Sequence, residues 1–367
     1  MTSPRNVAWW SPAMSGGELA RVSRVLESNY LNEGDVTTAF EAKVAELTGA
    51  RHAVAVTSGT AALFLSLKAL EIGAGDEVIV PDVTFVATAN AVVMAGATPV
   101  LVDVDEVTLN ISVPAMEEAF TARTKAVIPV HVSGRAADME AILRVCAARG
   151  IFVVEDAAEA LCSRHRGRYL GTFGSTGCFS FSPNKTITTG QGGVVVTNDD
   201  QVHRRLRELK DQGRPARGTG GDDLHPAIGF NFKFTNLQAA VGLAQLEVLD
   251  ARLERIRRTY AIYKDGLSGV EGVRVLPFDL KTGEQPQWAD ALAERRNELD
   301  AYLAENGAHC RRFWFPIHTQ SPYRAPDDAF PIATRMSAKA IWLPSAFQMT
   351  DDDADYVCGL IRRFYSA

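Results

Sequence analysis

The chain has 367 residues, 46% hydrophobic and 22% charged, which is the composition of a soluble globular protein large enough for two domains. Its 38 Lys and Arg against 44 Asp and Glu give a net charge of −6, which argues against nucleic acid as a partner. No apolar run is long enough to span a membrane, no secretory leader opens the chain, and five scattered cysteines without a C-x-x-C pair suggest no disulfide or metal site but a cytoplasmic location.

Short apolar segments recur through the first half of the chain, each with the length of a β-strand. Several are apolar on both faces, as expected for buried strands of a mainly parallel sheet that helices cover on both sides. The stretches around 60–72, 84–96 and 134–149 are long enough for the helices that connect parallel strands. The seven predicted strands span residues 53–57, 77–81, 99–104, 126–132, 151–156, 178–182 and 193–197.

The pattern changes after residue 197. Residues 199–210 predict a charged helix, and 213–223, rich in Gly, Arg and Asp, predict a loop. Apolar residues three and four apart then predict one long helix from 236 to 260 that links two domains. Its arginines are interpreted as a solvated face; they are Arg252, Arg255, Arg257 and Arg258.

The remaining part of the chain mixes short strands with helices around 291–306 and 351–365. This mixture predicts a smaller α+β domain. We therefore expect a large domain over residues 1–250, which includes an N-terminal helical segment and the central sheet, and a small C-terminal domain over 251–367.

Three segments carry chemistry. In the first, a strand ends at Thr57-Ser58-Gly59-Thr60 and an Ala- and Leu-rich helix begins. Free N–H groups and the positive end of the helix dipole suit a phosphate there, although Ser or Thr is also the ordinary N-cap of a helix.

In the second segment, a buried strand ends in Glu155-Asp156, at the edge where open α/β sheets bind ligands. An acid there suits a cationic partner, but it is also compatible with a helix cap.

The third segment is a turn that follows the strand ending near Ser182 and carries one lysine, Lys185. Its neighbours are small or apolar, and the glycine-punctuated run Gly190-Gln191-Gly192-Gly193 leads into the next strand. Desolvation of such a lysine lowers its pKa and makes a neutral amine available for imine formation. A loop lysine that is simply solvated is the open alternative.

The order of these segments resembles the DegT/DnrJ/StrS type of pyridoxal-phosphate (PLP) dependent sugar-nucleotide aminotransferase, which belongs to the aspartate aminotransferase fold class, fold type I. The similarity is strong over about 30–250 and looser beyond, and it is nearest to perosamine-synthase-like members. Each motif is weak alone, but their conjunction is specific. The matching stretches are Ser58 to Leu63, Val80-Pro81 through Thr84-Phe85, Glu155 to Ala158, Phe179 to Phe181 with Lys185, Gly190 to Gly193, Gly229 to Asn231 and Asn236 to Ala240.

The resemblance implies a role for each matching site residue. Lys185 would be the Schiff-base lysine and would later shuttle the proton, and Asp156 would pair with the pyridine nitrogen of PLP. Gly59, Thr60 and Ser180 look like phosphate ligands.

Four further positions carry implications. Phe85 would stack on the ring, with core packing as its alternative. Asn231 would reach the cofactor phosphate of the neighbouring subunit, which implies a homodimer with shared active sites. Glu159 would lie near the phenolic oxygen, where many relatives carry Gln or His. Lys233 stands where many relatives have Arg, which puts a bidentate phosphate contact in doubt.

The implied reaction moves an amino group from L-glutamate to a nucleotide-linked keto-sugar, with a GDP-linked 4-keto-6-deoxyhexose favoured. Relatives that replace the lysine by His are sugar dehydratases, whereas this chain keeps Lys185. A UDP- or dTDP-linked sugar, a ketocyclitol, a small keto-phosphate and a non-catalytic PLP-binding regulator are the alternatives. The segment Arg311 to His318, continuing through Pro322-Tyr323, resembles a substrate-side segment. Its Arg, Trp and His side chains either contact the substrate or belong to a packed aromatic strand with exposed arginines.

Overall fold

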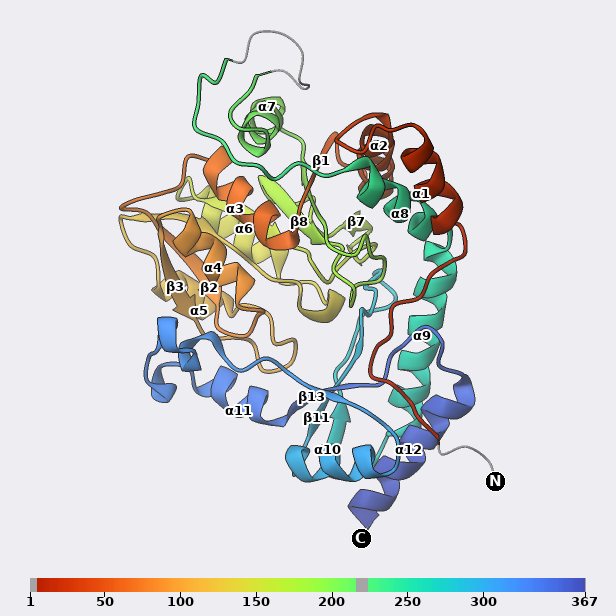
Figure 1. Cartoon of the computed structure of the whole chain (residues 1–367). Helices are drawn as coiled ribbons and strands as arrows, with labels where there is room; N and C mark the ends of the chain where they lie inside the picture. The colour runs from red at the N-terminus through yellow and green to blue at the C-terminus, as the bar shows by residue number, and fades with distance from the viewer. Residues whose placement is uncertain (1–4, 216–223, 367) are drawn as a thin grey trace.

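The computed structural model describes residues 5–215 and 224–366, and a seven-stranded sheet lies at its centre (Figure 1). The strands stand in the order β1-β9-β8-β5-β4-β2-β3. Strand β9 runs antiparallel to both of its neighbours and the other pairs are parallel, which confirms the predicted mainly parallel α/β sheet. The strands are β1 (His52–Val56), β2 (Glu77–Pro81), β3 (Thr98–Val102), β4 (Thr124–Val127), β5 (Phe152–Asp156), β8 (Thr176–Ser180) and β9 (Gly193–Thr197).

Helices cover both faces of this sheet because its strands bury side chains on both faces. In β1, Val54 and Val56 point to one face and join a core with α3, α4 and α7. Ala53 and Ala55 point to the other face, where α2, α8 and α9 pack. Helices α5 and α6 cover that second face over β2, β4 and β5. The bounds are α2 (Asp35–Thr48), α3 (Gly59–Ala69), α4 (Ala87–Met94), α5 (Val113–Glu118), α6 (Met139–Ala147), α7 (Asp200–Lys210), α8 (Asn236–Glu247) and α9 (Leu249–Gly266).

A second, four-stranded antiparallel sheet is built from residues after 272 and confirms the predicted smaller α+β part (Figure 1, cyan to blue). Val7 joins its core, and the Val7 N–H donates to the Gly307 carbonyl at 2.7 Å. The domain limit at residue 250 stays a prediction. The elements are β10 (Val273–Val275), β11 (Ala289–Ala293), α10 (Arg296–Glu305), β12 (Arg311–Arg312), α11 (Pro331–Lys339), β13 (Ala340–Leu343) and α12 (Asp351–Ser366).

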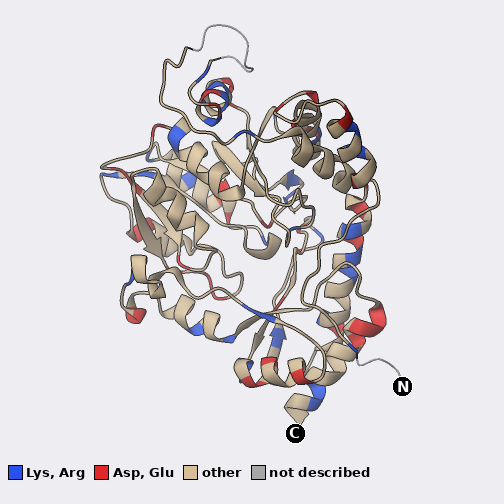
Figure 2. Ribbon diagram, in the orientation of Figure 1, with Lys and Arg blue, Asp and Glu red and all other residues tan. Residues whose placement is uncertain are grey.

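The predicted single helix from 236 to 260 is wrong, because two helices meet at Val248, where φ is −110° and ψ is 11°. No Gly or Pro marks this break, so the pattern of apolar residues runs through it. The interpretation of all its arginines as solvated is wrong for Arg252, which is buried. Acidic and basic residues alternate along the outer side of α9 (Figure 2), but Arg252 turns inward to bind backbone carbonyls.

Some element limits also differ from the prediction. The expected strand 126–132 ends at Val127, just before Pro129, which lacks an N–H group for the ladder. The expected helix 134–149 begins only at Met139, after a 3-10 turn at η1 (Val132–Gly134). Of the loop expected at 213–223, residues 216–223 lie outside the described residues. The other elements are α1 (Glu18–Glu27), β6 (Arg164–His165), β7 (Arg168–Tyr169), η2 (Ile317–Thr319), η3 (Ser321–Tyr323) and η4 (Asp327–Ala329).

Within 5–215 and 224–366, no helix combines the length and apolar character needed to cross a membrane. The same part of the chain holds no group of three or more His, Cys, Asp or Glu residues arranged for a metal ion.

Candidate active site

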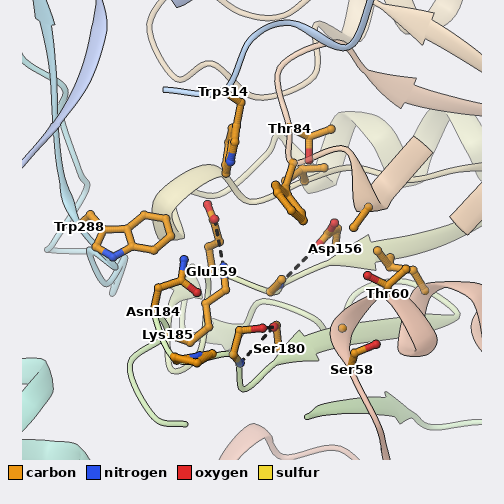
Figure 3. A pocket seen from close by; sticks show the side chains of 18 of the residues that line it. Ser58, Thr60, Thr84, Asp156, Glu159, Ser180, Asn184, Lys185, Trp288 and Trp314 are labelled. Atoms are coloured by element: carbon orange, nitrogen blue, oxygen red, sulfur yellow. Dashed lines mark hydrogen bonds and ion pairs between the residues drawn. The ribbon is translucent and has the colours of Figure 1, made fainter. Parts of the chain in front are cut away.

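A cavity of about 470 Å³ lies at the carboxyl ends of β1, β5 and β8 and is closed on its other side by the second sheet. Ligands of open α/β sheets bind at this edge because loops and helix N-termini meet there. Polar residues from separate parts of the chain point into the cavity (Figure 3). The lining residues are Ser58, Gly59, Thr60, Leu63, Thr84, Phe85, Ala87, Val130, Asp156, Ala158, Glu159, Ser180, Ser182, Pro183, Asn184, Lys185, Gln191, Trp288, Arg311, Trp314 and Trp342.

The N-terminus of α3 forms one end of the cavity. Ser58 caps the helix, and its hydroxyl accepts a hydrogen bond from the Ala61 N–H at 3.1 Å. The N–H groups of Gly59 and Thr60 are first-turn donors, which have no acceptor within a helix. A Cβ at Gly59 would lie 2.9 Å from the Cβ of Ser180, so only glycine leaves room between the helix end and β8. The result is a cradle of donors for an anion.

The two acids at the end of β5 have different functions because successive side chains of a strand point to opposite faces. Glu155 is buried behind the sheet, where it accepts hydrogen bonds from the Gly171 N–H at 2.7 Å and other donors. Asp156 faces the cavity and accepts hydrogen bonds from the Thr88 hydroxyl at 2.8 Å and the Ala158 N–H at 3.1 Å. Burial raises the pKa of Asp156 above its usual range, despite these two hydrogen bonds. No Lys or Arg among the described residues forms an ion pair with it.

Lys185 enters the cavity from the segment between β8 and β9. Its Nζ lies 3.1 Å from Oε1 of Glu159 and 5.0 Å from the ring centroid of Trp288 (Figure 3). The other carboxylate oxygen of Glu159 accepts a hydrogen bond from the Ser133 N–H at 2.9 Å. The Lys185 side chain is only 11% exposed, so the amine is held in a largely dry pocket beside a fixed carboxylate.

Tryptophans form the wall of the cavity on the side of the second sheet. The ring centroids of Trp288 and Trp342 are 5.0 Å apart, and Trp314 packs edge-on against Trp342 at 4.9 Å. Trp288 and Trp342 were not predicted as site residues, because no local motif marks them. Trp342 lies in β13, which pairs with β11 and β12, and Trp288 directly precedes β11, so the second sheet brings both to the cavity. A linear pattern does not show this.

The C-terminal segment that resembles a substrate-side segment divides in the structure. Arg311 and Trp314 line the cavity, whereas His318 is buried away from it. His318 Nδ1 lies 2.5 Å from a carboxylate oxygen of Asp82, and its ring stacks on Phe330. His318 therefore fastens η2 to the end of β2 and does not face the cavity.

The structure brings together seven of the eight residues predicted to bind the cofactor. Asn231 is the exception. It is exposed, forms an isolated antiparallel β-bridge with Asp211, and does not line the cavity. Lys233 lies nearby, with Nζ 2.6 Å from the Asp211 carboxylate. The seven that line the cavity are Gly59, Thr60, Phe85, Asp156, Glu159, Ser180 and Lys185.

These residues fit PLP. The donor cradle at Gly59 suits its phosphate, and Lys185 offers an amine to its aldehyde. No Lys or Arg of the described residues pairs with the buried Asp156 carboxylate, and the protonated ring nitrogen of PLP would supply a cation there. The fold and this set of groups define a class, that of PLP-dependent enzymes.

Comparison with known proteins narrows the class. The chain belongs to the DegT/DnrJ/EryC1/StrS aminotransferase family, whose model matches residues 12–362, and it is therefore a PLP-dependent aminotransferase. It is 39% identical to the GDP-perosamine synthase of Escherichia coli O157:H7 over 359 residues, 97% of this chain and 98% of that protein. It is 37% identical to the putative pyridoxal phosphate-dependent aminotransferase EpsN of Bacillus subtilis (strain 168) over 371 residues, 96% and 94% of the two chains.

A solved structure agrees with this assignment. The crystal structure of DesV from S. venezuelae in complex with a ketimine intermediate superimposes with a TM-score of 0.92 at 32% identity, covering 99% of each chain. The resemblance drawn from the sequence motifs is thus confirmed at the level of family, fold and cofactor.

Proposed function

We propose that this aminotransferase moves an amino group from L-glutamate to a nucleotide-linked keto-sugar, and that the acceptor is a GDP-linked 4-keto-6-deoxyhexose. The observation that carries the proposal is a single cavity in which the α3 cradle, Asp156 and Lys185 meet beside an aromatic wall that bears Arg311. A long, partly anionic acceptor suits a cavity that extends past the lysine to a guanidinium. The similarity to a GDP-perosamine synthase along almost the whole chain supports the choice of sugar.

Lys185 and Asp156 are the proposed catalytic residues. Bound PLP supplies an electron-accepting ring that carries the amino group between the two half-reactions. Asp156 holds the proton on the ring nitrogen through its buried carboxylate. Lys185 Nζ binds the cofactor between turnovers and moves the proton that each half-reaction transfers.

Glu159 is proposed to hold the amine of Lys185 in position and to exchange a proton with it. Its Oε1, 3.1 Å from Nζ, is the nearest carboxylate oxygen in the site and is within reach to accept a proton from the amine. The Ser133 N–H holds the other oxygen, so the carboxylate cannot turn away. Such a pair holds Nζ at one place in the cavity, beside a group that is able to accept a proton.

The remaining cofactor contacts follow from position. Gly59, Thr60 and Ser180 are proposed to bind the phosphate, and Phe85, 54% exposed at the cavity, to cover the ring. Asn231 is proposed to reach the phosphate of a partner subunit, so that the active unit is a homodimer. The five cysteines are free, and this supports the reducing cytoplasm as the place where the enzyme works.

The absorbance spectrum of the PLP-loaded protein, recorded before and after L-glutamate, tests the proposal, with L-glutamine as a parallel donor. We expect the visible band of the lysine-bound cofactor to be replaced by the band of the aminated cofactor. Keto-sugars linked to GDP, UDP and dTDP should then be compared as acceptors that restore the first band. A band that neither donor discharges would instead favour a different donor or a PLP-binding protein without turnover.

Lys185→Ala tests the role of the lysine. The variant should still bind PLP through the α3 cradle but lose turnover completely, because no amine is left to bind the cofactor or to carry the proton. Tryptophan fluorescence quenching reports binding, and product formation reports turnover. Sustained product formation by the variant would overturn the assignment.

A further inference from the structure

The segment that carries Lys185 has no helix or strand from residue 181 to 192, and the Lys185 N–H donates within it to the Ser182 carbonyl at 3.0 Å. Side chains from distant parts of the chain supply further partners for the backbone around the lysine. Trp10 Nε1 donates to the Pro183 carbonyl at 3.1 Å. The Gln287 side-chain oxygen accepts from the Thr186 N–H at 3.3 Å and from its hydroxyl at 2.7 Å. The residues on either side of Lys185 are therefore held from outside the loop.

Arg252 of α9 supplies the most central of these contacts. Its Nη1 donates to the Thr186 carbonyl at 3.0 Å and also to the Gln245 side chain. Its Nη2 donates to the carbonyl of Ala13 in the N-terminal segment. The planar guanidinium thus joins the lysine loop to two other segments at once, which a single-point cation such as Lys would not achieve.

Within residues 5–215 and 224–366, no carboxylate pairs directly with the buried Arg252, and its charge is compensated by other groups. The side chain is 7% exposed, and burying an unpaired charge is costly unless its donors are satisfied. Gln245, fully buried, bridges Arg252 to the carboxylate of Glu18. Burial alone would raise the pKa of Glu18, but hydrogen bonds from the Ser15 backbone and the Gln245 side chain lower this pKa to about 2. Glu18 therefore stays ionised as the distant counter-charge.

The N-terminal segment around Trp10 packs beside Arg252. The ring of Phe347 contacts Trp10 edge-on at 4.7 Å and lies 5.0 Å from the guanidinium carbon of Arg252. The Ser345 N–H donates to the Trp9 carbonyl at 2.8 Å. Trp10 and Arg252 are thus fixed relative to each other by contacts that do not involve the lysine loop.

We propose that Arg252 is a positioning residue for Lys185, and that Trp10 assists it from the N-terminal segment. Arg252 holds the carbonyl next to the lysine, so the amine stays at its contact with Glu159. The inference rests on the proposed function of Lys185. Arg252 does not line the cavity, and it acts on the reaction through its contact with the lysine loop.

Three variants of the full chain, loaded with PLP, test the proposal. Arg252→Gln removes the clamp, and Trp10→Phe removes only the donor to Pro183 while an aromatic ring is kept. Arg255→Gln is the matched control, because Arg255 lies one turn along α9 and pairs with Asp351 at 2.8 Å, away from the loop. For each variant we would measure the L-glutamate half-reaction, the pH titration of the visible band and the thermal unfolding.

Arg252→Gln should lower the rate of the half-reaction at saturating L-glutamate by ~10- to 100-fold and leave the KM unchanged, because a displaced amine impairs the reaction more than donor binding. The visible band should titrate at lower pH, because the protonated nitrogen that joins Lys185 to the bound cofactor would lie farther from the Glu159 carboxylate. Trp10→Phe should shift the band in the same direction by less. It changes no charge, so this shift would exclude a direct electrostatic effect.

Two results would overturn the proposal. One is an Arg252→Gln protein with the wild-type rate and band titration. The other is a loss that matches Arg255→Gln and only follows the decrease in unfolding temperature. If Arg252→Gln does not fold, Trp10→Phe with a wild-type band and rate decides against the proposal. A wild-type protein that forms no visible band would speak against the proposed function itself, and the two failures are thereby distinguished.

Discussion

Glu155 and Asp156 show how much a single residue's surroundings decide. Both end the same buried strand, and Asp156 was predicted from the motif to be the acid that binds the cofactor. In the structure the Glu155 carboxylate accepts hydrogen bonds from backbone N–H groups on the far side of the sheet, whereas Asp156 faces the cavity. The difference arises from the alternation of side chains along a strand, so a shift of one residue would exchange their functions.

Asp156→Asn should affect stability and activity in opposite directions. Burial raises the pKa of Asp156, so the folded, cofactor-free protein binds this proton more tightly than the unfolded chain does. The stability that this proton contributes is complete below the unfolded pKa and is lost as pH rises through the raised folded pKa. The neutral variant should therefore be more stable than wild type at pH 8, by ~1 kcal/mol, and no different at low pH.

With PLP bound, the order should reverse, because the ring nitrogen then supplies the missing cation, and turnover by the variant should fall on the order of 100-fold. Thermal unfolding of both proteins between pH 4 and 8, with and without PLP, measures these effects. A cofactor-free variant that is less stable than wild type at pH 8 would contradict the electrostatic interpretation of Asp156.

At the scale of elements, the junction of β1 and α3 was predictable, whereas the junction of α8 and α9 was not. A small-residue turn between an apolar strand and an Ala-rich helix marks the first in the sequence. At the second, no Gly or Pro interrupts the helical pattern around Val248. The break instead accompanies tertiary contacts, in which Gln245 and Arg252 both turn toward the lysine loop.

Gly59→Ala tests the cradle at the start of α3. The added Cβ would lie 2.9 Å from the Cβ of Ser180 and would force the helix end and β8 apart. Such overpacking costs about 1–3 kcal/mol, so we expect the affinity for PLP to fall ~10-fold or more. Pyridoxal, which lacks the phosphate, should lose much less affinity in the same fluorescence titration.

Gly359→Ala on α12 is the matched control, since its Cβ would meet nothing closer than an Arg363 side-chain nitrogen at 3.6 Å. This variant should bind PLP as wild type does. Equal losses for PLP and pyridoxal in Gly59→Ala would show that the phosphate is not bound at this helix end.

At the scale of the whole molecule, the position of Asn231 bears on assembly. It is exposed and does not line the cavity of its own chain, so its predicted contact with a phosphate requires a second subunit. Mixed dimers of Lys185→Ala and Asn231→Ala test this. One of the two sites in each mixed dimer would carry both substitutions and the other site would carry none.

Each variant alone should be nearly inactive, and random mixing should restore about a quarter of the wild-type sites, since half of the dimers are mixed and each has one intact site. Turnover before and after mixing by unfolding and refolding together measures the recovery, and sedimentation verifies that dimers form. Dimers without recovered turnover would show that Asn231 does not serve the partner's site.

The sequence by itself determined the strands, the helices that cover them, and the order of cradle, acid and lysine, because period-two and helical patterns and turn residues act through near neighbours. It also determined Gly59, Asp156 and Lys185 as candidates. Only the tertiary structure decided that Trp288 and Trp342 form the cavity wall, that His318 pairs with Asp82 instead of facing the cavity, and that Arg252 is buried against the lysine loop. These contacts join residues far apart in the chain, and packing between elements selects them, which no local pattern records.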